Sequence, residues 1–205
     1  MPGETQLYYI EWMNLVLASQ SPRRAGLLRT AGFSFTVRAR PIEEVRHDGE
    51  SPIDYVRRLA REKAEAAWER DGEIVLGADT IVVVGSQVLE KPSDLNDARS
   101  MLAALSGRTH TVITGIGLRH AKGAIVDAES TLVHFVPLTD EEIDAYVATG
   151  EPMDKAGAYA IQGLASKFVD RIEGCYFNVM GLPLARVYRH WKSLVTSPSR
   201  PSTSA

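Results

Sequence analysis

The chain has 205 residues, with 23 lysines and arginines against 26 aspartates and glutamates, which gives a net charge of −3. Apolar residues make up 44% and charged residues 24%, a mixture that excludes a disordered chain, a collagen and a coiled coil. The near-neutral charge argues against a dedicated binder of nucleic-acid polymers, although it leaves room for a local cluster of Arg and Lys.

Composition also suggests where the folded part begins and ends. The length predicts one or two domains, and we expect a single domain over residues 13–195. Residues 1–12 have no basic n-region and no continuous apolar run, so we interpret them as an N-terminal extension or a mis-called start rather than a signal peptide. The Ser- and Pro-rich residues 196–205 are expected to form a disordered tail.

The apolar and cysteine content bear on cellular location. The longest apolar stretch, Ile74 to Val84, contains Asp79 and falls short of the roughly 20 residues that a spanning helix needs, so no membrane contact is expected. A single cysteine, Cys175, excludes an intramolecular disulfide and a paired-thiol zinc site. Low cysteine usage fits a reducing cytoplasm, which is the predicted location.

Strand and helix signals alternate through the first half of the chain. Ser21-Pro22 and Ser51-Pro52 each place a serine N-cap before a proline at the first helical position, so each marks the start of a helix. In chain order we predict a strand at Leu15–Ser19, a helix at Pro22–Ala31 and a strand at Ser34–Arg38. A polar loop over residues 39–50, a long helix at Ile53–Glu69 and two strand runs at Ile74–Leu76 and Thr80–Val84 follow. Gly77-Ala78-Asp79 is expected to interrupt the last two runs.

Hairpin signals dominate the second half. Gly85-Ser86 is a two-residue turn that predicts a hairpin. We predict a strand at Gln87–Leu89, a helix from Ser93 or Asp94 to Leu105, and two strands at Thr109–Leu118 and Ala128–Val136. A helix at Thr139–Ala148, a Gly-rich segment over residues 150–166, a strand at Phe168–Ile172 and a helix at Leu184–Leu194 follow. Because hairpins interrupt the alternation, we predict an α/β fold with a mixed twisted sheet, flanking helices and two lobes around a central cleft.

The segment LASQSPRR, from Leu17 to Arg24, is the first candidate site. A strand leads into a capped helix start, where free N–H groups and the helix dipole attract anions. Arg23 and Arg24 add planar donors that match phosphate oxygens. The alternative is a capped surface helix with solvated arginines.

Asp79 is the second candidate. A carboxylate between the apolar runs IVL and IVVV is costly in a core unless it is paired, so it is expected to face a cleft or a metal. Burial and nearby cations would tune its pKa for work as a general base. The alternative is an Asp at a strand bulge that accepts hydrogen bonds from backbone N–H groups.

Two further segments carry charge beside glycine or proline. Glu90-Lys91-Pro92 follows the hairpin strand, and the segment from Glu151 to Gly163 holds Lys155 and Gln162. The glycines of that segment would let backbone approach a ligand, and the Gln162 amide could read a base edge. An ordinary charged loop is the alternative for both, and surface salt pairs would explain Glu44 and Lys63.

Several catalytic motifs are absent from the sequence. It contains no GxxxxGK[ST], no complete GxGxxG, no GxSxG and no HExxH. What remains is a set of Arg, Lys and carboxylates without a Ser, Cys or His nucleophile arrangement. Carboxylates suit Mg²⁺ or Mn²⁺ and the basic groups suit phosphates, so the set favours metal-assisted attack of water on a polyphosphate.

Taken in order, the motifs resemble the Maf family of nucleoside triphosphate pyrophosphatases. The resemblance covers about Leu15 to Trp191 and rests on LASQSPRR, LAREKA, GADTIV, LEKP, LSGRTHTVITG, EPMDKAGAYAIQG and GLP. It implies a two-lobed α/β fold related to inosine triphosphatases. It also implies hydrolysis of a nucleoside triphosphate at the α-phosphorus, with a divalent cation (Mg or Mn), to a monophosphate and pyrophosphate.

The resemblance assigns roles to individual residues. Asp79 falls on the catalytic proton acceptor, and Asp79 with Glu44 supplies carboxylates near the metal. The expected substrate-binding residues are Arg23, Arg24, Lys63, Thr80, Lys91, Lys155 and Gln162. Whether Asp79 acts as base or metal ligand stays open.

A branch of the family is also implied. Arg23, Thr80 and Gln162 fall on the specificity positions and resemble the branch that hydrolyses dTTP and UTP. The family further implies a possible homodimer. Two alternatives stay open: a regulatory protein that inhibits septum formation, and a pyrophosphatase for another non-canonical nucleotide.

Overall fold

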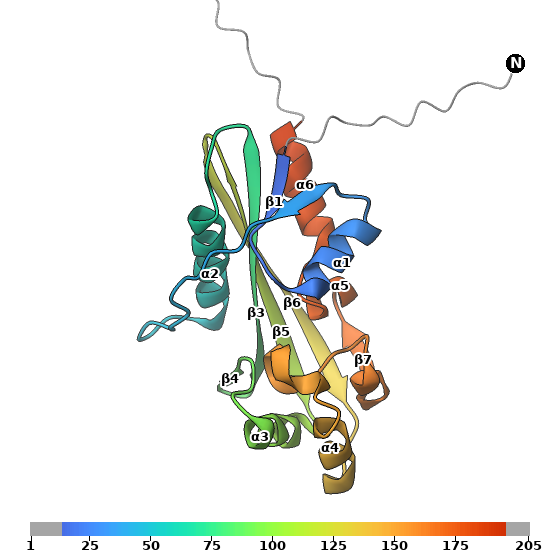
Figure 1. The fold of residues 1–205 in the computed structure, drawn as a ribbon. Helices are drawn as coiled ribbons and strands as arrows, with labels where there is room; N and C mark the ends of the chain where they lie inside the picture. Colours follow the sequence, from blue (N-terminus) through green and yellow to red (C-terminus); the bar gives the residue numbers. More distant parts are fainter. Residues whose placement is uncertain (1–13, 196–205) are drawn as a thin grey trace, which may run out of the picture.

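The computed structural model describes residues 14–195, so the predictions for residues 1–12 and 196–205 lie outside the described residues. Within this range, seven strands form one mixed sheet in the order β2-β1-β3-β5-β6-β7, and β4 pairs with β3 beside that path (Figure 1). β1 runs parallel to β2 and β3, and the other pairs are antiparallel. The strands are β1 Asn14–Leu17, β2 Phe35–Val37, β3 Glu73–Val84, β4 Gln87–Leu89, β5 Thr109–His120, β6 Gly123–Phe135 and β7 Val169–Glu173.

Helices cover both faces of the sheet (Figure 1). They are α1 Pro22–Thr30, α2 Pro52–Ala66, α3 Leu95–Leu105, α4 Asp140–Val147, α5 Tyr176–Val179 and α6 Leu184–Val195, with short 3₁₀ helices η1 Glu151–Asp154, η2 Ala156–Ala158 and η3 Leu164–Phe168. The predicted N-caps are confirmed: Ser21 accepts from the Arg24 amide, Ser51 accepts from the Asp54 amide, and Thr139 forms a capping box.

The hydrophobic core is divided along the length of the long strands. One cluster packs α1 and α6 against β1 and one end of the sheet, around Leu28 and Trp191. A second packs α3, α4 and η3 against the other end, around Leu102 and Phe168. β3, β5 and β6 run through both lobes (Figure 1). The predicted class, a mixed sheet with flanking helices in two lobes, is confirmed.

The predicted interruption of β3 at residues 77–79 is wrong. β3 is continuous from Glu73 to Val84, and Asp79 lies opposite Gly115 of β5 in an unbroken register. Gly77 is needed because helix α2 packs directly on the strand: a Cβ at Gly77 would lie 2.1 Å from the Ala60 carbonyl oxygen. The glycine therefore marks close helix packing rather than a turn, and Asp79 does not sit on a bulge.

Other boundaries also differ from the predicted ones. α2 ends at Ala66, before the predicted Glu69. β6 begins at Gly123 instead of Ala128, and its acidic Asp127 is neutralised there by Arg186 of α6 at 2.9 Å. The short helix α5 was not predicted at all.

Candidate active site

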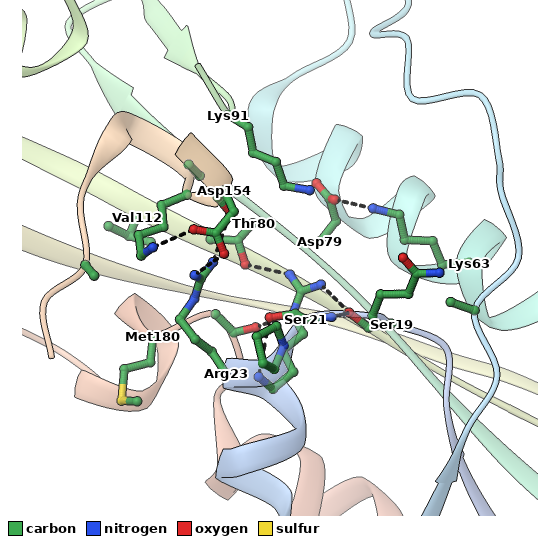
Figure 2. Close-up of a pocket in the computed structure, with 18 of the residues that line it drawn as sticks. Ser19, Ser21, Arg23, Lys63, Asp79, Thr80, Lys91, Val112, Asp154 and Met180 are labelled. Carbon is green, nitrogen blue, oxygen red and sulfur yellow. Dashed lines mark hydrogen bonds and ion pairs between the residues drawn. The ribbon is translucent and has the colours of Figure 1, made fainter. Parts of the chain in front are cut away.

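A pocket of about 730 Å³ opens where one edge of β3 lacks a strand partner. β1 pairs with that edge as far as Leu76, and β4 takes it up again at Val82. Between these two residues this edge of β3 is unpaired. Successive side chains of a strand point to opposite faces of the sheet, and here the space on both faces joins into one pocket through the gap at the edge. Asp79 and Thr80 therefore line one pocket from opposite sides (Figure 2).

Asp79 is held by a lysine from helix α2. The Lys63 Nζ lies 2.6 Å from the Asp79 Oδ1 and 3.0 Å from the Glu44 Oε2, so the ammonium bridges both carboxylates. The side chains of Asp79 and Lys63 are only 11% and 14% exposed, whereas Glu44 is 47% exposed. A nearly buried ion pair with an exposed carboxylate at its mouth matches the predicted surroundings of Asp79.

Glycines in the sheet bring Lys63 to this place. A Cβ at Gly115 would lie 2.2 Å from the Val56 carbonyl oxygen, and one at Gly117 would lie 2.9 Å from that of Ala60. Together with Gly77 they let the backbone of α2 lie on the strands without intervening side chains. Lys63, in the next turn of α2, therefore reaches the carboxylate of Asp79 on the adjacent strand.

Arg24 reaches the pocket from α1 and is fixed by three acceptors. Its Nε donates to the Gly181 carbonyl at 2.8 Å, and its terminal nitrogens donate to the Ser19 hydroxyl at 3.2 Å and to the Thr80 hydroxyl at 3.1 Å. Burial lowers the pKa of the Arg24 guanidinium, and the negative charge of Asp79 opposes that shift. A bound anion would compensate the buried charge.

Arg23 and Lys155 meet at a carboxylate that sequence reasoning did not select. The Arg23 Nη1 lies 2.8 Å from the Asp154 Oδ2, and Lys155 pairs with the other oxygen of Asp154. Lys155 also donates to the Glu151 carbonyl. Burial opposes the shift, but the hydrogen bond from Lys155 and the charge of Arg23 hold the pKa of Asp154 below its ordinary value. Asp154 thus partly neutralises two of the predicted substrate-binding groups.

The other predicted residues also line the pocket. Lys91 is exposed and has no ion pair within residues 14–195, and in Figure 2 its side chain extends toward Asp79. Gln162 lies on the exposed rim. Glu44, Lys63, Asp79, Thr80, Arg23, Arg24 and Lys155 complete the set, so the pocket brings together every residue that the sequence selected.

A buried tyrosine that sequence reasoning missed lies behind the pocket, next to the lining residue Glu44. The Tyr55 hydroxyl, on α2, lies 2.7 Å from the Glu90 Oε1 and 3.2 Å from the Glu44 carbonyl oxygen. Burial and the neighbouring Glu90 raise the pKa of Tyr55. The sequence pattern singles out Glu90 as a neighbour of Lys91. It does not single out Tyr55, because an aromatic residue on an amphipathic helix usually belongs to the hydrophobic core.

Asp79 and Glu44 are the carboxylates of the pocket that could hold a divalent cation. Among the described residues, no group of three or more His, Cys, Asp or Glu side chains is placed to hold a metal ion. Asp79 and Glu44 nevertheless lie on the same ammonium group at the pocket mouth. Mg²⁺ commonly takes one or two carboxylates and completes its shell with water and substrate phosphates. The carboxylates of Asp79 and Glu44 fit this kind of coordination.

Over residues 14–195, helices are too short or too polar to cross a bilayer.

Comparisons with known proteins cover most of the chain. A family model described as "Maf-like protein" matches residues 14–194. Two relatives named dTTP/UTP pyrophosphatase are those of Koribacter versatilis, 53% identical over 89% of this chain and 95% of its own, and of Anaeromyxobacter dehalogenans, 55% identical over 83% and 89%. A HAM1 protein of Coxiella burnetii is 13% identical, covers 90% of this chain and 100% of its own, and has a TM-score of 0.47. That likeness is too low to bear on the fold class, which rests on the sheet itself.

The family model spans the whole pocket, from LASQSPRR to the Gly181 segment, and the relatives are identical at more than half of the aligned positions. The chain therefore belongs to the Maf-like protein family.

Proposed function

We propose that this chain hydrolyses dTTP and UTP to the nucleoside monophosphate and pyrophosphate. The observation that carries the proposal is the nearly buried Asp79–Lys63 pair in a pocket that also collects Arg23, Arg24 and Lys91. The relatives named dTTP/UTP pyrophosphatase support the same substrates. A carboxylate surrounded by cations suits attack of water on a phosphoanhydride, because the cations stabilise the charge on the phosphate oxygens.

Asp79 is the proposed catalytic residue. Its Oδ1 accepts from Lys63, which orients the carboxylate, and its other oxygen is the one available to take a proton from the attacking water. Arg24 and Lys91 face the same space and would bind the triphosphate, with two N–H groups of Arg24 left over from its protein contacts. Gln162, on the rim, would pair with the base.

Asp79 and Glu44 would hold a divalent cation, Mg or Mn, together with the substrate phosphates. When bound, the cation polarises phosphoryl oxygens and neutralises their charge. Lys63, which now bridges the two carboxylates, would keep them oriented. A homodimer and a cytoplasmic location stay predictions from the sequence.

The test is a nucleotide panel with added Mg²⁺ and detection of pyrophosphate. We expect dTTP and UTP to be hydrolysed far faster than dCTP, GTP or ITP, with pyrophosphate formed in equal amount to the monophosphate. Faster turnover of a purine nucleotide would overturn the substrate assignment, and release of single phosphates would overturn the reaction.

A further inference from the structure

A chain of hydrogen bonds leads from the pocket along one face of the sheet into the core. Arg24 donates to the Thr80 hydroxyl at 3.1 Å, the hydroxyls of Thr80 and Thr114 lie 2.9 Å apart, and Thr114 donates to the Asn178 carbonyl at 3.1 Å. Thr114 and Asn178 are completely buried. The chain thus links α1, β3, β5 and α5, and only its first two residues touch the pocket.

The direction of each hydrogen bond follows from counting protons. A carbonyl oxygen can only accept, so the single hydroxyl proton of Thr114 goes to Asn178. The proton between the two threonines must then come from Thr80. The opposite direction would leave Thr114 and the Asn178 carbonyl as two acceptors in contact inside the core, which is costly. Since Arg24 can only donate, Thr80 accepts from it.

This direction restricts what Thr80 can do. Its only proton is used inside the protein, so toward the pocket Thr80 can accept a hydrogen bond but cannot donate one. Phosphate oxygens are acceptors, so Thr80 has nothing to offer them. Its strong contact is with the guanidinium of Arg24, which makes Thr80 a link rather than a phosphate ligand.

Asn178 anchors the far end of the chain. Its side-chain amide donates to the Val112 carbonyl and to the Thr131 hydroxyl, both at 3.0 Å, and its carbonyl also accepts from the Gly181 amide at 2.9 Å. The Gly181 carbonyl is in turn the acceptor for the Arg24 Nε. Asn178 therefore holds two of the three acceptors of Arg24 in place: Thr80, through Thr114, and Gly181, through its backbone amide.

We propose that Thr114 is a positioning residue of the active site, which fixes the orientation of the Arg24 guanidinium through Thr80 and Asn178. This inference rests on the proposed function, in which Arg24 binds the triphosphate. It changes the role of Thr80 from substrate binding to positioning. It also explains why a threonine that touches no pocket lies completely buried with its hydroxyl paired on both sides.

The test compares Thr114→Val with Thr114→Ser, and uses Thr111→Val as a matched control. Thr111 lies on the same strand, faces the opposite side of the sheet, and has no side-chain hydrogen bond within the described residues. We expect Thr114→Val to lower kcat/KM for dTTP about tenfold, mostly through KM, because a misplaced Arg24 weakens ground-state binding of the phosphates. Thr114→Ser keeps the hydroxyl and should stay within about twofold of the unmodified protein, as should Thr111→Val.

A double variant separates positioning from packing. If Thr114 acts through Thr80, the loss in Thr80→Val/Thr114→Val will be smaller than the product of the two single losses. The proposal is overturned by a multiplicative double variant, by an unchanged Thr114→Val, or by a Thr114→Ser that fails to restore KM. Isothermal titration with inorganic pyrophosphate reports on the same variants without turnover, and Thr114→Val should bind it more weakly.

The two proposals can fail separately. If the unmodified protein hydrolyses no nucleotide, the proposed function fails, and the titration alone decides the role of Thr114. Weaker pyrophosphate binding by Thr114→Val, with unchanged binding by Thr114→Ser and Thr111→Val, supports the positioning role. Equal binding by all variants, or no binding by the unmodified protein, overturns it.

Discussion

Gly77→Ala tests whether close packing of α2 sets the Asp79–Lys63 geometry. The new methyl group would lie 2.1 Å from the Ala60 carbonyl oxygen and 2.7 Å from the Ala64 amide nitrogen, both of them backbone atoms of α2. Neither can rotate away, so the helix has to retreat by roughly 1 Å to reach ordinary contact. Lys63 lies between those two residues and moves with them.

The expected magnitudes follow from that displacement. Overpacking of this kind costs about 1–3 kcal/mol of unfolding free energy, and a shift of about 1 Å in a catalytic group can cost about 100-fold in rate. We therefore expect kcat for dTTP to fall about 100-fold in Gly77→Ala. Urea unfolding and steady-state kinetics on the same preparation measure both quantities.

Two further glycines make the comparison quantitative. Gly117→Ala places its methyl group 2.9 Å from the Ala60 carbonyl oxygen, so its effects should be smaller than those of Gly77→Ala. Gly26→Ala, on α1, meets nothing within 4 Å and should leave kcat unchanged, with a small gain in stability of about 0.4–1 kcal/mol. The reasoning is refuted if Gly77→Ala keeps both its kcat and its unfolding free energy.

Two other predictions concern paired groups. Lys63→Met leaves the Asp79 carboxylate without its counter-ion and should lower kcat by about 100-fold or more, measured with saturating dTTP; a loss below about fivefold would contradict the role of Lys63. His110 is buried beside the Tyr159 hydroxyl, and burial lowers its pKa to about 4, so the unfolded chain binds its proton first as the pH falls. Stability from this group is complete above about pH 6.5 and decreases by up to about 3 kcal/mol as the pH falls toward 4. The double variant His110→Phe/Tyr159→Phe should lose that part of the pH dependence in urea unfolding, and an unchanged pH profile would contradict the assignment.

Local signals were enough to predict most elements and to single out Asp79, Arg23 and Arg24, whereas residues such as Glu44 and Lys63 were selected only through the family resemblance. Ser21-Pro22 and Ser51-Pro52 identify helix starts because an N-cap is decided by neighbouring residues alone. Asp79 stood out because an ionised group between apolar runs requires a partner. Arg23 and Arg24 follow a strand and begin a helix, which predicts an anion site from spacing.

Features that depend on distant partners could not be predicted in this way. The sequence predicts an interruption at Gly77, because nothing beside that residue shows that α2 packs on it. Asp154 lies in a charged loop, and its pairing with Arg23 joins residues 131 positions apart.

The chain Arg24–Thr80–Thr114–Asn178 shows the same limit for polar residues. Threonine is common in strands, so Thr114 on β5 gives no signal of its own. Its role depends on β3 and α5 meeting at one point of the sheet, which only the folded chain reveals.

Comparison of Asp79→Asn with the unmodified protein tests the central claim most directly. The substitution keeps the size and the hydrogen-bonding reach of the side chain while removing the charge that Lys63 balances. With dTTP or UTP, Mg²⁺ and pyrophosphate detection, we predict that turnover by Asp79→Asn is abolished while its unfolding transition shows an intact fold. Near-normal pyrophosphate release by Asp79→Asn would contradict the account.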